Sequence, residues 1–228
     1  LNLYINNIMS ESIVITSATR TAVGSLGQSL KNIPGDELGS VVISEAITRS
    51  KLKKDDVDEV IMGQVLTGGT GQNPARQAAM RCGIPKEKPA YVVNQVCGSG
   101  IRSVASAYQS IKSGDSKIVV AGGQENMSLA PHAIHLRNGK KLGDVQAVDT
   151  MIKDGLWDAF HNYHMGVTAE NVATKFQITR AEQDKFALNS QEKAFKAIKD
   201  NKFKDEIVSL KIKSKKSEIN FDKDEHPR

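Results

Sequence analysis

The sequence NQVCGSGIRS, residues 94–103, places Cys97 between an apolar stretch and two glycines. We expect a strand to end and a helix to begin there, because residues 98–115 have helical spacing. The first amides of a helix have no helical partner and favour a nearby anion, such as a thiolate or the oxyanion of an attacked thioester. Gly98 and Gly100 would let a substrate approach the backbone closely. The stretch is therefore a candidate site for covalent catalysis by a thiol.

The pattern C-G-x-G leaves two interpretations of Cys97 open. A helix terminus contributes only about 0.3 to 1 kcal/mol to a neighbouring charge, which leaves a thiol mostly protonated at neutral pH. A nucleophilic cysteine would therefore need a base as well. The alternative is a buried cysteine that packs as a small apolar side chain, and this is what we expect for Cys82, inside a predicted helix.

Strands and helices alternate around this cysteine, which is typical of a parallel sheet in an α/β protein. The predicted strands are 12–18, 58–66, 91–96 and 117–123, and the predicted helices are 36–50, 74–82 and 98–115. Asp36 and Asn73 are placed as helix caps, Pro74 as a first helical residue, and Gly83 and Gly114 as helix stops. Open α/β folds bind ligands at the carboxyl edge of the sheet, where Cys97 would lie.

The helix that follows Cys97 has an unusual distribution of side-chain sizes. Large apolar residues lie on one side, and the other sides are small: Ile101, Val104, Tyr108 and Ile111 against Ser103, Ala105, Ser106 and Ala107. Such a helix suits burial between two layers, so we expect it to be covered on two sides.

The pattern changes after residue 127. Residues 127–164 lack a clear period, and a stretch of that length is usually functional or disordered. Helices are predicted again at 166–176 and 179–200, the second with a capping box formed by Thr179 and Glu182. A half-exposed strand is predicted at 206–213.

The composition limits the classes of function that we expect for the protein. The 31 basic and 26 acidic residues give a net charge of +5, but much of the excess lies in residues 211–228, so nucleic acid is not an expected partner. That lysine-rich stretch is either a solvated face or a site for a phosphorylated small molecule. Two cysteines and no secretory signal indicate a cytoplasmic protein, and no window approaches the roughly 20 apolar residues of a membrane span.

Two H-x-x-H pairs raise the question of a metal site. They are His132 with His135 and His161 with His164. Neither pair has the accompanying carboxylate of a pattern such as H-E-x-x-H, so we expect no bound metal.

Four separated blocks resemble, in order, the amino-terminal half of thiolases, particularly acetyl-CoA C-acetyltransferases. They are NQVCGSGIRS, VAGGQENMSLAPH, DTMIKDGLWDAF and YHMGVTAENVA, and the stretches SATRTAVGSLGQSL and GQNPARQAA fit as well. The similarity covers residues 12–228. It implies a thiolase-like layered α/β fold of which only the amino-terminal βαβ half-domain and part of the loop region are present.

The resemblance also implies a reaction and its residues. Cys97 would take the acetyl group of acetyl-CoA as a thioester, and a second acetyl-CoA, deprotonated at its α-carbon, would attack it to give acetoacetyl-CoA. Leu156, His164, Met165 and the terminal Arg228 match positions that contact coenzyme A in the family. Coenzyme A thioesters would be substrates, and no permanently bound cofactor is expected.

The domain organisation follows from the same resemblance. Residues 9–126 would form the α/β core, residues 127–228 an incomplete CoA-binding and tetramerisation loop region, and residues 1–8 a disordered tail or misassigned start. Residues 68–77 match a dimer contact, and residues 133–148 match the loop through which thiolase dimers pair into tetramers; the alternative for that loop is an exposed flexible segment. We therefore expect a homodimer or homotetramer for the intact family.

The departures from the family pattern concern the catalytic partners of the thiol. Thiolases carry N-E-A-F-A, G-H-P and C-x-G-G blocks in a second half-chain, and this sequence contains none of them. We therefore expect a truncated chain that is inactive alone. The alternatives are a fragment of a longer-chain 3-ketoacyl-CoA thiolase, which Met165 disfavours by resemblance, a non-catalytic half-subunit, or a decayed fragment.

Overall fold

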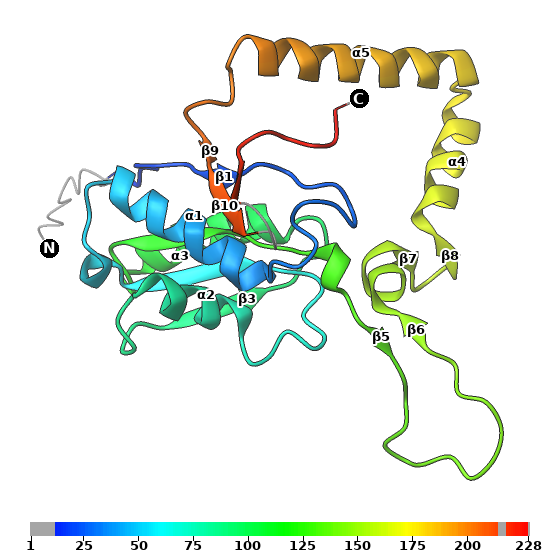
Figure 1. Ribbon diagram of the computed structural model, residues 1–228, viewed down its shortest axis with the longest axis horizontal. Helices are drawn as coiled ribbons and strands as arrows, with labels where there is room; N and C mark the ends of the chain where they lie inside the picture. The colour runs from blue at the N-terminus through cyan, green and yellow to red at the C-terminus, as the bar shows by residue number, and fades with distance from the viewer. Residues whose placement is uncertain (1–11, 214–217, 228) are drawn as a thin grey trace, which may run out of the picture.

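A three-stranded parallel sheet forms the centre of the protein (Figure 1). The structure is a computed structural model that describes residues 12–213 and 218–227, so the expectations for residues 1–8 and Arg228 lie outside the described residues. The strands are β2 (Glu59–Gly63), β3 (Ala90–Val93) and β4 (Val119–Gly123), in the order β3-β2-β4. The prediction of a parallel α/β sheet is thus confirmed.

Helices cover both faces of this sheet. Helices α1 (Gly35–Arg49) and α2 (Pro74–Cys82) pack on one face, where Val60 and Met62 join the main apolar cluster with Ile43 of α1. Helix α3 (Ser99–Ser113) lies on the other face, and its Ser103 donates a hydrogen bond to the carbonyl oxygen of Gly122 at 2.7 Å. Alternating side chains of β2 therefore face opposite layers, as a pleated strand requires.

The predicted helix ends are confirmed for α2 and α3. The Asn73 side chain accepts a hydrogen bond from the Arg76 amide at 3.1 Å, and Pro74 is the first residue of α2. Gly83 and Gly114 close α2 and α3 with φ values of +85° and +86°, which favour glycine.

The predicted cap of α1 is wrong. The cap position is Pro34, and Asp36 lies inside the first turn, where it is buried and forms an ion pair with Arg81 of α2. A carboxylate is stabilised there both by the amide groups of the helix start and by the arginine.

The predicted strand 12–18 is also wrong, because no strand occurs there. The short β1 (Arg20–Thr21) follows instead, and Ile15 is 78% exposed. A groove of about 310 Å³ lies between residues 13–17 and the edge strand β4. The β-branched pattern gives the local preference for a strand, but a strand also needs a neighbouring edge at hydrogen-bonding distance.

Helix α3 is covered on one side only within the described residues. Its small residues Ser99, Ser103 and Ala107 are buried, whereas Ile101 is 74% exposed and Tyr108 is also exposed. The expectation of cover on two sides is therefore wrong for this chain.

The end of the chain returns to its beginning. The predicted strand 206–213 is divided into β9 (Ile207–Val208), which pairs with β1, and β10 (Leu210–Lys213), which pairs with β11 (Glu218–Phe221). Leu210 and Phe221 are buried in a second apolar cluster with three residues from the start of the chain, Ala22, Leu30 and Leu38.

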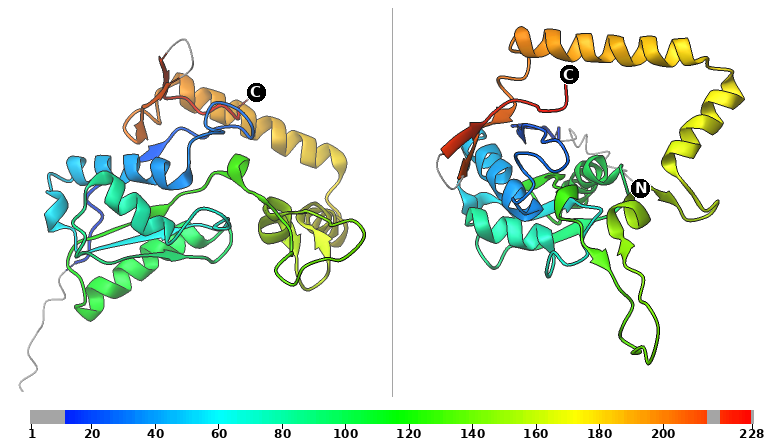
Figure 2. Two further views of the ribbon diagram at one scale, coloured as in Figure 1. Left: turned by 60° about the horizontal axis from the view of Figure 1, so that its bottom comes forward. Right: turned by 45° about the vertical axis from the view of Figure 1, so that its right-hand side comes forward.

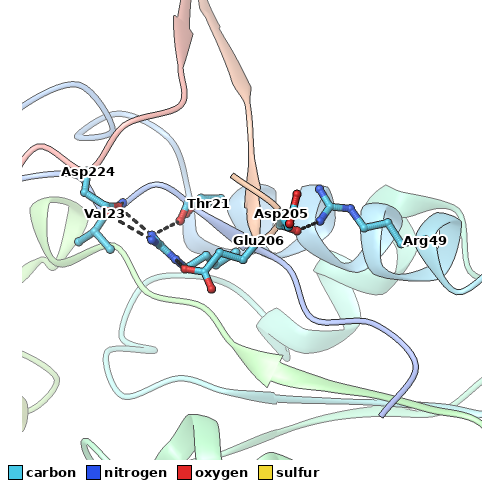
Figure 3. Close-up of polar contacts among 7 residues, drawn as sticks. Thr21, Val23, Arg49, Asp205, Glu206 and Asp224 are labelled. Atoms are coloured by element: carbon cyan, nitrogen blue, oxygen red, sulfur yellow. Dashed lines mark hydrogen bonds and ion pairs between the residues drawn. The ribbon is translucent and has the colours of Figure 1, made fainter. Parts of the chain in front are cut away.

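An ion-pair network fixes this return (Figure 3). The guanidinium of Arg20 donates to Glu206 at 2.7 Å and to both carboxylate oxygens of Asp224 at 2.7 and 3.0 Å. Asp224 also accepts a hydrogen bond from the Val23 amide at 2.7 Å. The hydrogen bond from Arg20 and the amide both hold the pKa of Asp224 below its usual value.

Most of the chain between β4 and β9 forms an arm that extends away from the sheet in all three views (Figures 1 and 2). Helices α4 (Met165–Phe176) and α5 (Arg180–Lys199) contain no buried residue, and the predicted capping box of Thr179 and Glu182 is confirmed. The remaining elements are η1 (Lys54–Asp56), η2 (Met127–Leu129), β5 (His132–Ala133), β6 (Val148–Asp149), η3 (Met151–Leu156), β7 (Trp157–Asp158) and β8 (Tyr163–His164). Among the helices of the described ranges, none has both the length and the apolar character needed to cross a membrane.

Substitution of Gly63 tests the contact between β2 and α3. A Cβ at Gly63 would lie 2.4 Å from the carbonyl carbon of Ser99, so Gly63→Ala must displace backbone. We expect a loss of about 1 to 3 kcal/mol or more in the free energy of unfolding, measured by urea denaturation. Gly100→Ala is the control, since a Cβ there meets nothing within 4 Å, and it should not lower stability. Equal losses in both variants would contradict the assigned contact.

The Asp224 carboxylate gives a second test. We expect Asp224→Asn to lower the free energy of unfolding at pH 7 by about 1 to 3 kcal/mol, because the partly buried Arg20 loses one of its two charged partners. Since the folded state lowers the pKa of Asp224, the contribution is present above the unfolded value near 3.8 and is lost as the pH falls through the folded value. The exposed pair Arg180–Asp184 is the control, so Asp184→Asn should change stability little. A pH dependence of unfolding unaltered by Asp224→Asn would contradict this account.

Candidate active site

Cys97 lies in the connection between β3 and α3, at the carboxyl edge of the parallel sheet. Its side chain is exposed, so the alternative of a buried apolar cysteine is wrong for this residue. Strand β3 ends at Val93 rather than at residue 96, and Cys97 is joined to Gln95 by an isolated bridge. Cys82 is buried as expected, and this burial raises the pKa of its thiol. Cys97 therefore places an exposed thiol at the edge where such folds bind ligands.

The backbone just before Cys97 is strained. Val96 has a φ of +49°, a left-handed conformation that is unfavourable for a β-branched residue. Residues held in such conformations cost on the order of 1 to 3 kcal/mol and persist where the surroundings fix them. The strained residue turns the chain from β3 into α3 and sets the direction of Cys97.

The amides after Cys97 differ from the expectation. The Gly98 amide donates to the Gln95 carbonyl and the Ser99 amide to the Val96 carbonyl, each at 3.0 Å, so these two groups are occupied. The amides of Gly100 and Ile101 have no hydrogen-bond partner in the part of the chain that the structure describes. These two amides, like the amide of Cys97 itself, have no partner among the described residues and are free to serve an oxyanion, and the space next to Gly100 is open.

Glu125 connects two loops at the same edge. It follows β4, and its carboxylate accepts hydrogen bonds from the amides of Val65 at 2.8 Å and Leu66 at 3.3 Å, just beyond β2. Burial raises the pKa of Glu125, and the two amide hydrogen bonds oppose this shift. The sequence analysis assigned no role to Glu125, although its position directly after a predicted strand was an available signal.

Side-chain amides complete this polar layer. The buried Gln124 donates to the buried Gln64 at 2.9 Å, and Gln64 in turn donates to the Leu66 carbonyl at 3.1 Å. Asn94, between β3 and Cys97, donates to the Val65 carbonyl at 3.4 Å. The loops after all three strands are therefore held together beside Cys97.

The predicted CoA-contacting residues lie together in a separate segment. Leu156 ends η3, and His164 is paired with Trp157 in the β7–β8 hairpin. His164 accepts a hydrogen bond from the Gly166 amide at 3.0 Å, which caps α4 directly before Met165.

Gly155 brings this segment close to the carboxyl edge of the sheet. A Cβ at Gly155 would lie 3.7 Å from the Leu66 side chain, in the loop that Glu125 holds. Leu156 follows Gly155, so the segment begins beside the Cys97 edge. Within the described ranges, no hydrogen bond or ion pair links Leu156, His164 or Met165 to Cys97.

Histidines from both H-x-x-H pairs have other partners. His161 lies 2.9 Å from the Asp158 carboxylate, and hydrogen bonds from the His161 amide and ring hold the pKa of Asp158 below its usual value. His132 lies 4.0 Å from Asp149. In the portion of the chain with described coordinates, no group of three or more His, Cys, Asp or Glu side chains could hold a metal ion.

Comparison with known proteins identifies the relatives. Residues 13–228 match the family model described as "Thiolase, N-terminal domain". The chain is 57% identical over 217 residues to acetyl-CoA acetyltransferase of Rhizobium meliloti and 51% identical over 222 residues to the cytosolic acetyl-CoA acetyltransferase of Rattus norvegicus. These alignments cover 95% and 97% of this chain, but 55% and 56% of the relatives.

A solved structure agrees in fold. The crystal structure of Bacillus anthracis acetyl-CoA acetyltransferase superposes with a TM-score of 0.91 at 41% identity, over 94% of this chain and 55% of that one. The chain thus spans about half the length of the relatives it matches. By sequence and by fold, this protein belongs to the thiolase family, with its residues 13–228 corresponding to the N-terminal domain.

Proposed function

We propose that Cys97 accepts the acetyl group in an acetyl-CoA acetyltransferase reaction of the thiolase type. The observation that carries the proposal is the exposed thiol at the carboxyl edge of the sheet, next to the unpartnered amides of Gly100 and Ile101. The names of the relatives support acetyl-CoA, rather than a longer acyl-CoA, as the substrate.

The first step of the proposed reaction forms a thioester on the protein. The Cys97 thiolate attacks the carbonyl carbon of acetyl-CoA, and the carbonyl oxygen becomes an oxyanion that the two free amides could stabilise. Collapse of this intermediate breaks the bond between the carbonyl carbon and the sulfur of coenzyme A. Coenzyme A leaves as a thiolate and takes up a proton, and the acetyl group remains on Cys97.

The second step would consume this thioester. The α-carbon of another acetyl-CoA loses a proton and attacks the acetyl carbonyl, which gives acetoacetyl-CoA and regenerates the Cys97 thiolate. The C-x-G-G block, which supplies the base of this step in the family, does not occur in this sequence, and the chain corresponds to about half of each relative. We therefore assign to these residues the acyl-accepting step, and full turnover to an assembly that includes the other half of the family fold.

The segment from η3 to α4 is the proposed binding region for coenzyme A. Leu156, His164 and Met165 lie within it, and Arg228 is proposed to join them. Its start beside Leu66 supports access to the Cys97 edge. Coenzyme A thioesters would bind there as substrates that leave after each turnover, not as a resident cofactor.

We further propose a cytoplasmic homo-oligomer. The rat relative is named as cytosolic, which supports the location. The loop between β5 and β6 protrudes from the body, and its Leu142 is 90% exposed, which supports a role in pairing subunits (Figure 1).

Incubation with acetyl-CoA tests the proposed acyl acceptor. We expect the intact mass of the chain to increase by one acetyl group at Cys97 after incubation at pH 9, because this exposed thiol is the nucleophile of the first step. Cys97→Ser should lose the rapid adduct. Cys82→Ser is the matched control and should keep it, because that thiol is buried.

Two results would overturn the assignment of Cys97. One is an acetyl adduct of undiminished rate in Cys97→Ser. The other is a wild-type chain that takes up no acetyl group at pH 9 while remaining folded by circular dichroism.

A further inference from the structure

The side chain of Ser99 binds the loop that carries Cys97. Its hydroxyl accepts a hydrogen bond from the Gln95 amide at 2.9 Å and donates one to the Val96 carbonyl at 2.6 Å. Ser99 is only 4% exposed, so water does not compete for either bond. The hydroxyl therefore ties the first residue of α3 to the two residues just before Cys97.

This hydroxyl bridge spans the strained residue. Val96 has a φ of +49°, and its carbonyl is one of the two groups that Ser99 holds. A valine released from this constraint favours negative φ, which would rotate the following peptide and the Cys97 side chain. The bridge thus opposes the local preference of the chain at the point that sets the direction of the thiol.

Ser99 itself cannot follow the loop. Its backbone lies against Gly63 at the end of β2 so closely that a Cβ on Gly63 would be 2.4 Å from the Ser99 carbonyl carbon. The sheet fixes Ser99 from one side, and the hydroxyl passes this constraint to the loop. Movement of Ser99 would require movement of β2, which lies in the middle of the three strands.

We propose that Ser99 is a positioning residue for Cys97. By binding Gln95 and Val96, its hydroxyl holds the loop so that Cys97 lies at the start of α3, next to the free amides of Gly100 and Ile101. This inference rests on the proposed function of Cys97, because the orientation of the thiol matters only if the thiol reacts. The competing explanation is that a buried serine merely stabilises α3.

Ser103 provides the matched comparison. It lies on the same face of α3, is 0% exposed, and donates to the carbonyl oxygens of Gly100 at 2.6 Å and Gly122 at 2.7 Å. It has no hydrogen bond to residues 95–97 in the described part of the chain. Loss of its hydroxyl should affect stability in a similar way and leave the Cys97 loop unchanged.

The experiment measures alkylation of Cys97 by iodoacetamide in the full chain, with the modified peptide identified by mass spectrometry. We expect Ser99→Ala to slow alkylation about two- to fivefold, the size of a helix-terminus effect on a neighbouring charge. Ser99→Thr keeps the hydroxyl and should restore the wild-type rate. Ser103→Ala should lower the melting temperature but leave the alkylation rate unchanged.

A second variant, Val96→Asn, separates the effect of Ser99 on the strained loop from its effect on stability. Asparagine accepts positive φ more readily than valine, so in Val96→Asn the loop needs the hydroxyl less, and adding Ser99→Ala should slow alkylation by less than in the wild type. The Val96→Asn background also provides a folded reference if Ser99→Ala alone does not fold.

Three results would overturn the inference: a wild-type alkylation rate in Ser99→Ala, equal slowing in Ser103→Ala, or an undiminished effect in the Val96→Asn background. Alkylation needs no acetyl-CoA, so its outcome is independent of the acetylation test. A Ser99 effect without an acetyl adduct would reject the proposed reaction and keep the positioning role.

Discussion

The close contact between the strand ends and the start of α3 is the constraint on which the site depends. Gly63 ends β2 directly against Ser99, and a Cβ on Gly123, at the end of β4, would be 3.4 Å from Cα of Gly100. Because neither strand end carries a side chain, the helix rests on the backbone of the sheet. The amides of its first turn therefore lie at the edge where the three connecting loops meet.

The same edge holds polar groups that an apolar core would exclude. Glu125 is half-buried with a raised pKa, and one side-chain oxygen of Gln124 has no partner among the described residues. Such groups cost free energy, and their hydrogen bonds to the loop after β2 offset part of that cost. Apolar side chains at this edge would be more stable, but they would not form the hydrogen bonds that hold three loops in one arrangement around an exposed thiol.

Local signals in the sequence predicted the parts of this structure that depend on neighbours along the chain. Asn73, Gly83 and Gly114 act where predicted, because caps and stops are set by a few adjacent residues. The edge position of Cys97 followed from the alternation of strands and helices. The strand predicted at 12–18 is absent for the opposite reason, because a strand must pair with the edge of another strand that is distant in the sequence. The bridge from Ser99 to a strained Val96 likewise depends on backbone angles that residue types do not reveal.

The pairing of β1 with β9 has a consequence for the order in which the molecule is made. Arg20 and Glu206 are 186 positions apart, and Leu38 shares a buried cluster with Phe221. During synthesis on the ribosome, the sheet and its three helices can assemble while this cluster still lacks its last members. Apolar side chains near the start of the chain must then stay open to solvent or to chaperones until the final strands emerge.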